Sequence, residues 1–134
     1  MVGVRETLRA VRVVDADGKI LGRLATEVAT ALRGKDHPRW VPYRDEGATV
    51  VVTNTEKIRV TGTKMHGKLY TRHTQRKPGA FRQYTLRQRM EKDSRQVVRD
   101  AVFGMLPKNR LRHRMITHLR LYRGAAPTEL KDVR

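Results

Sequence analysis

Five consecutive β-branched residues, TVVVT at positions 49–53, constrain the fold of this chain more than any other segment. β-branched side chains favour strands, and a run without polar alternation indicates a strand that is buried on both faces. Strands of this kind are typical of α/β proteins, where other elements cover the sheet. We therefore expect a strand over residues 48–54 in the interior of the fold.

The residues before this run complete a strand–helix–strand unit. Residues 11–20 begin with a β-branched stretch and continue with the turn signal DADG at 15–18. Residues 22–34 carry apolar side chains at helical spacing and end on Gly34, a common helix stop. A helix between two strands predicts a βαβ unit with a right-handed crossover, and hence the α/β class.

A basic β-hairpin is predicted over about residues 67–85. Residues 67–73 and 80–85 have strand composition, and the loop 74–80 between them is rich in cations and turn formers. Among the aromatic side chains of the hairpin, we expect packing against the core rather than stacking on nucleic acid.

Three further helices and a last strand follow the hairpin. The sequence TLRQ at 85–88 fits a capping box, and Ser94 is suited to cap the next helix. Pro107 must end that helix, because the residue before a proline is driven out of the α region. Asn109 is a good cap for a helix over 110–119, and alternation then predicts a strand. Arg112 is expected on the exposed surface of this helix, and Arg120 and Arg123 are expected to point outward from the strand.

The whole pattern predicts a single domain. Residues 11–124 are expected to form it, with the last strand at 118–124. Residues 1–10 are expected to be an N-terminal extension, and residues 125–134 a C-terminal tail on the surface. A chain of 134 residues can bury a sizeable core.

Charge indicates the class of partner. The chain has 30 Lys and Arg against 13 Asp and Glu, for a net charge of +17. Residues 1–61 hold 11 basic and 8 acidic residues, net +3, whereas residues 62–134 hold 19 and 5, net +14. A half so positive repels itself unless a polyanion neutralises it, which favours nucleic acid as the partner.

Other function classes lack the residues that they need. The absence of cysteine excludes disulfides and thiolate chemistry, and the five histidines do not pair with carboxylates at catalytic or metal-ligating spacing. We expect no catalytic residue, no metal, no cofactor, no small-molecule substrate and no membrane association, and a cytoplasmic location. The alternatives left open are a nucleoid-type DNA-binding protein and an RNA-processing enzyme.

Cations concentrate where phosphates could bind. Lys19 and Arg23 flank a helix start, the hairpin interleaves cations with aromatics, and Lys108 and Arg110 flank the next helix start. The alternative interpretation is a tight turn for the stretch around Lys19 and Arg23, and a solvated surface for the hairpin. The candidate nucleic-acid-binding residues are Lys19, Arg23, Lys64, Lys68, Arg72, His73, Arg76, Lys77, Arg82, Lys108, Asn109, Arg110, Arg112, Arg114, Arg120 and Arg123.

Four stretches in a fixed order carry a resemblance. They are VVDADGKILGRLATEVA, HPRWVPYRDEG, VVVTNTEKIRVTG and GMLPKNRL, which begin at residues 13, 37, 50 and 104. In this respect the chain resembles the bacterial large-subunit ribosomal protein L-thirteen family. The resemblance implies a three-layer α/β/α domain around a small, mainly parallel four-stranded sheet. It also implies a structural role on the ribosome, with 23S rRNA and neighbouring large-subunit proteins as partners and entry early in subunit assembly.

The chain departs from that family at three places. The hairpin loop at 73–80 is richer in cations than the glycine-rich loop of the family, and it lacks the family's tyrosine. Arg112 stands where the family commonly has glycine. Ala48 stands before the second strand, where the family often has aspartate. None of these changes threatens the expected fold.

Overall fold

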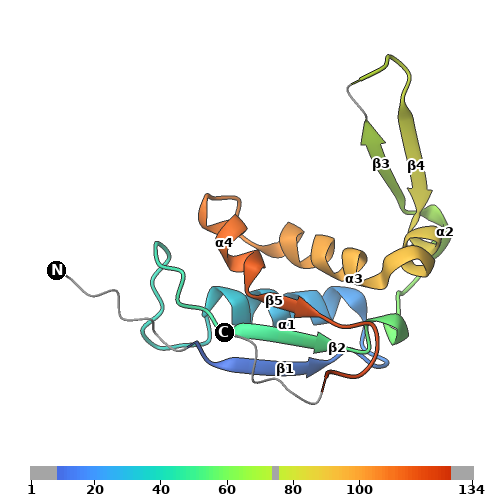
Figure 1. Cartoon of the computed structure of the whole chain (residues 1–134). Helices are drawn as coiled ribbons and strands as arrows, with labels where there is room; N and C mark the ends of the chain where they lie inside the picture. The colour runs from blue at the N-terminus through green and yellow to red at the C-terminus, as the bar shows by residue number, and fades with distance from the viewer. Residues whose placement is uncertain (1–8, 74–75, 128–134) are drawn as a thin grey trace.

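The chain folds into a mixed α/β body from which a two-stranded hairpin projects (Figure 1). The structure is a computed structural model that describes residues 9–73 and 76–127. The expected tail beyond residue 127, most of the expected extension and two residues of the hairpin loop lie outside the described residues.

A three-stranded parallel sheet forms the base of the body. Its strands are β1 (Val11–Asp15), β2 (Thr49–Thr53) and β5 (Leu119–Leu121), in the order β1-β2-β5. All five residues of β2 are buried, as the β-branched run predicts for a central strand. The separate antiparallel pair consists of β3 (Leu69–His73) and β4 (Phe81–Thr85), so the predicted hairpin is confirmed.

Helices connect these strands. They are α1 (Leu21–Arg33), the 3-10 turn η1 (Thr55–Lys57), α2 (Lys64–Gly67), α3 (Leu86–Met105) and α4 (Leu111–Thr117). The predicted helix over 22–34 is confirmed as α1, and Gly34 ends it with a left-handed φ of 73°. The predicted helix over 110–119 is present but shorter, because α4 gives way to β5 at Leu119.

Buried side chains of α1, α3 and α4 form one apolar cluster on one face of the sheet. The cluster includes Val50 and Val52 of β2 but not Val51, which points to the opposite face. The strand order explains this arrangement, because right-handed crossovers that advance in one direction across a sheet pass over the same face. In Figure 1, α1 and α3 accordingly lie side by side above the strands.

Two finer expectations about the sheet are not met in the described part of the chain. The sheet has three strands rather than four, and the one further pairing, Ile20 with Arg59, is an isolated bridge. A second helical layer is absent from the described residues, because α1, α3 and α4 share the cluster on one face. The α/β class with a small parallel sheet is confirmed.

The long helix α3 is kinked near its middle. Thr85 caps its start with the predicted capping box to Gln88. At Asp93 the backbone is non-helical, and the Asp93 carboxylate accepts hydrogen bonds from the Arg95 backbone N–H at 3.1 Å and from the Arg95 Nε at 3.0 Å. The prediction that Ser94 caps this second segment is therefore wrong: Asp93 does so, and the buried Ser94 hydroxyl lies 2.9 Å from Thr55 Oγ1.

The buried hydroxyl pair gives a first testable prediction. Replacing Ser94 with alanine leaves the buried Thr55 hydroxyl without its partner, so we expect the free energy of unfolding to fall by about 1–3 kcal/mol. Adding Thr55→Val to Ser94→Ala removes both polar groups and should restore part of the loss. Chemical denaturation measures both effects. Equal stability of wild type and Ser94→Ala would contradict the buried pair.

Candidate nucleic-acid interface

An open groove of about 840 Å³ lies between the hairpin and α3. We call it the hairpin groove. Its lining comes from β3, β4 and α3, so the point at which the hairpin joins α3 positions both walls. The lining residues are Tyr70, Thr71, Arg72, Arg82, Tyr84, Gln88, Arg89, Lys92, Asp93 and Gln96.

Two arginines face each other across the hairpin. Arg72 of β3 is directly opposite Arg82 of β4 in the antiparallel register, and both side chains are exposed. Neither guanidinium has an ion pair or hydrogen bond within the described residues. Like charges in directly opposed positions destabilise a strand pair, so the hairpin carries a repulsion that a bound anion would relieve.

The tyrosines of the groove are covered by cations of the same chain. The guanidinium of Arg89 lies 4.4 Å from the centre of the Tyr70 ring, and the Lys68 ammonium lies 5.1 Å from it. The Lys92 ammonium lies 5.9 Å from the Tyr84 ring. Both tyrosines are half-buried, and Tyr70 packs against the core, as expected for the hairpin aromatics.

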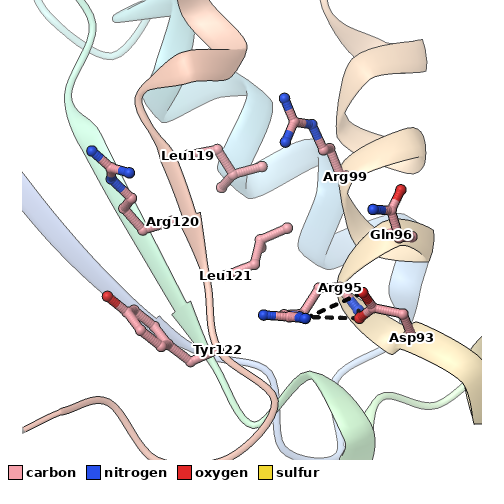
Figure 2. A pocket seen from close by; sticks show the side chains of 8 residues that line it. All are labelled: Asp93, Arg95, Gln96, Arg99, Leu119, Arg120, Leu121 and Tyr122. Atoms are coloured by element: carbon pink, nitrogen blue, oxygen red, sulfur yellow. Dashed lines mark hydrogen bonds and ion pairs between the residues drawn. The ribbon is translucent and has the colours of Figure 1, made fainter.

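A second hollow of about 420 Å³ continues along α3 to β5. Asp93 and Gln96 line both hollows, so the two adjoin. Figure 2 shows Leu119 and Leu121 pointing from β5 toward α3, whereas Arg120 points to the other side of the strand. Arg120 is exposed there, as predicted, and does not join the cations of the hairpin groove.

Sequence reasoning missed the cations of α3. Arg89, Lys92, Arg95 and Arg99 line these two hollows, although Arg95 is also held by Asp93. The missed signal is their spacing of three to four residues along one side of the helix, away from the buried valines. The structure thus brings Arg72 and Arg82 together with a row of cations on the opposite wall.

The corner after Pro107 has the predicted backbone but a different use of Arg112. Asn109 Oδ1 accepts a hydrogen bond from the Arg112 N–H at 3.2 Å, so the predicted capping role is confirmed. The Arg112 guanidinium donates to the Phe103 carbonyl, at 2.8 Å from Nε, and covers the Phe103 ring at 3.6 Å. Arg112, expected on the exposed surface, is half-buried and joins the end of α3 to α4.

The remaining predicted residues are exposed but scattered. Two of them are in ion pairs: Lys19 with Glu27 at 3.1 Å and Arg123 with Glu56 at 2.7 Å. The others have exposed side chains on α1, α2, the hairpin or the corner after Pro107. Unlike Arg72 and Arg82, they do not line the hairpin groove. These exposed residues are Arg23, Lys64, Lys68, His73, Arg76, Lys77, Lys108, Asn109, Arg110 and Arg114.

Arg9 anchors the start of the described chain. Its guanidinium donates to both carboxylate oxygens of Asp45 at 3.3 Å and to the carbonyls of Asp45 and Gly47 at 2.8 and 3.1 Å. The His118 Nε2 lies 3.4 Å from the same carboxylate. Burial and the nearby Arg9 charge lower the pKa of His118 below its ordinary value, and Asp45 opposes them.

The lowered pKa of His118 predicts how stability depends on pH. The unfolded chain takes up this proton near the ordinary pKa of 6.5, whereas the folded chain resists it until lower pH. We therefore expect the free energy of unfolding to decline as the pH falls below about 6.5. Urea titrations at several pH values measure this slope. His118→Gln should flatten it, and the same change at the exposed His66 should not.

Other kinds of site are not found in the described residues. Within them, no cluster of three His, Cys, Asp or Glu could hold a metal ion. None of the described helices has the length and apolar character that crossing a bilayer requires.

Comparisons with known proteins identify relatives of this chain. The family profile described as "Ribosomal protein L13" matches residues 9–128. A protein named "Large ribosomal subunit protein uL13" from Clostridioides difficile is 50% identical over 115 residues, which cover 86% of this chain and 80% of that protein. The protein of the same name from Aquifex aeolicus is 53% identical over 112 residues, 84% of this chain and 77% of that one.

Proposed function

Because this chain belongs to the ribosomal protein L13 family, we propose that it is a structural constituent of the large ribosomal subunit. In this role it binds and organises 23S rRNA, beginning early in subunit assembly. Neighbouring proteins of the same subunit are its other partners, and the cytoplasmic ribosome is its location.

The hairpin groove is the observation that supports RNA binding most directly. Arg72 and Arg82 are opposed, exposed and without an acidic partner in the described residues, and Lys92 faces them from α3. Phosphodiester backbones supply the negative charge that such a set lacks, and they are recognised by clustered Arg and Lys. A rigid body that holds these cations lowers the repulsion between RNA segments that converge on it.

The proposed contacts fall in two regions. The first is the hairpin groove with the exposed hairpin loop, including Arg76 and Lys77. The second is the corner of Lys108, Arg110 and Arg114, which the Arg112–Phe103 contact holds in place. Arg112 itself serves as a positioning residue in this proposal, and Lys19, Arg23, Lys64 and Arg120 are peripheral cations.

Two measurements test the proposed function. The chain should co-sediment with large subunits from cell lysate. If it engages six to ten phosphates, its affinity for large-subunit rRNA should fall by about a thousandfold or more between about 50 and 200 mM salt. Binding that ignores salt, or equal affinity for duplex DNA and folded rRNA, would count against the proposal.

The corner provides a finer prediction. Lys108→Ala and Arg110→Ala should each lower the slope of log affinity against log salt by about one unit, because each removes one phosphate contact. Both side chains are exposed, so thermal unfolding should remain unchanged. If neither variant changes the slope, phosphate docking at this corner is wrong while the hairpin groove is untouched.

A further inference from the structure

The two faces of the hairpin differ in chemistry. One face carries Arg72 and Arg82 with the two cation-covered tyrosines, and it turns toward α3. On the other face, strand alternation places the neutral residues Leu69, Thr71, His73, Phe81 and Gln83. This face of the hairpin thus carries no Lys, Arg, Asp or Glu side chain, although the chain has a net charge of +17.

Phe81 is the notable residue on that neutral face. It was expected to pack in the core, but its side chain is 46% exposed, and its ring contacts His73 at 4.9 Å between ring centres. Five of the seven aromatic rings in the chain have a cation above them: Trp40, Tyr43, Tyr70, Tyr84 and Phe103. No such cation covers Phe81 within the described residues, so part of its surface is open to a ligand.

We propose that Phe81, supported by His73, is a stacking platform for an unpaired RNA base. The inference rests on the proposed function, and it adds a base contact to a surface that otherwise binds backbone. Unpaired bases stack on exposed aromatic side chains, and each stacked base adds to affinity with little dependence on sequence.

The surroundings of Phe81 favour RNA over a protein partner. The exposed Arg76 and Lys77 lie in the loop that adjoins Phe81, so cations for phosphate binding stand next to the ring, whereas Arg82 turns to the opposite face. A stable protein interface buries roughly 800 Å² per partner. The neutral face has two exposed large apolar side chains, Phe81 and Leu69, which lie at opposite ends of the hairpin. They therefore do not form the continuous apolar area that such an interface needs.

The test separates stacking from charge. The full chain is titrated with two single-stranded probes of equal length: an oligoadenylate that contains 2-aminopurine, and a chain of abasic ribose phosphates. Wild-type protein should bind the base-bearing probe about tenfold more tightly and quench its fluorescence. Phe81→Leu should abolish both effects, whereas Phe81→Trp should keep them. Tyr43→Leu is the matched control, because Arg44 already covers that exposed ring at 5.8 Å.

A failure of the stacking platform can be distinguished from a failure of the proposed function. The salt slope should be the same for wild type, Phe81→Leu and Phe81→Trp, because none of them loses a phosphate contact. If Phe81→Leu keeps the preference and the quenching, the platform is wrong even though rRNA binding stands. If Phe81→Leu weakens co-sedimentation with large subunits but not the base preference, this face contacts a protein instead. Wild-type binding without salt dependence would overturn the proposed function itself.

Discussion

Gly47→Ala is expected to destabilise the fold by more than about 3 kcal/mol, the largest single-residue effect that we predict. A Cβ at this position would lie 1.6 Å from the Leu32 carbonyl oxygen and 2.4 Å from its carbon. These are backbone atoms at the end of α1, so no side-chain rotation relieves the overlap. The loop must then lift away, and with it the Arg9 contact to the Gly47 carbonyl. Thermal unfolding should shift down by roughly 10 °C or more.

Gly104→Ala is the matched control for this prediction. Gly104 lies in the last turns of α3, and a Cβ there would meet nothing within 4 Å. Alanine is the better helix former, so this variant should be unchanged or more stable by about 0.5–1 kcal/mol. A Gly47→Ala protein as stable as wild type would mean that the loop does not approach α1 as closely as the structure indicates.

The central strand and the first helix could be predicted because their signals are local. The β-branched run at 49–53 specifies a strand by composition, and Gly34 specifies a helix end by its freedom at positive φ. The importance of Gly47 could not be predicted, because it arises from a contact with Leu32 across the fold. The number of sheet strands and the face that helices cover depend on crossovers, which no single segment encodes.

Local competition between neighbouring polar residues explains the errors within helices. Asp93 and Ser94 are both good helix caps, and the choice is settled by Thr55, which pairs with Ser94 in the interior.

Arg112 is expected on the exposed surface because its spacing along α4 indicates solvent. The Phe103 carbonyl, near the end of a different helix, provides an acceptor that binds its guanidinium.

The candidate interface also combines features that the local sequence predicts with features that depend on the fold. The hairpin and its cations could be predicted from alternation and charge, whereas the groove position of the α3 cations depends on how the hairpin packs beside that helix. The register of the hairpin was also needed, because it sets Arg72 opposite Arg82. Charge counts indicate a nucleic-acid partner, but only the pairing of strands shows which cations lie together.

The opposed arginines allow stability and RNA binding to be separated. Arg82→Glu converts the cross-strand repulsion with Arg72 into an attraction, so the hairpin should be more stable by about 0.2–1 kcal/mol. The same change removes a proposed phosphate contact and adds a repelling carboxylate to the groove, so affinity for rRNA should fall. Hydrogen exchange of the hairpin and filter binding measure the two effects. A variant that binds more weakly because it unfolds would show the opposite change in exchange.

Reversing the charge of both arginines should have the largest effect on RNA binding. Arg72→Glu with Arg82→Glu replaces one like-charged pair with another, so the hairpin repulsion is kept while the groove loses two cations and gains two anions. We expect affinity for large-subunit rRNA near physiological salt to fall by about a hundredfold or more, with a lower salt slope. Lys35→Glu with Arg39→Glu makes the same change in net charge at exposed positions in the loop after α1, outside the hairpin groove. If this control loses as much affinity, net charge rather than the hairpin groove carries the binding.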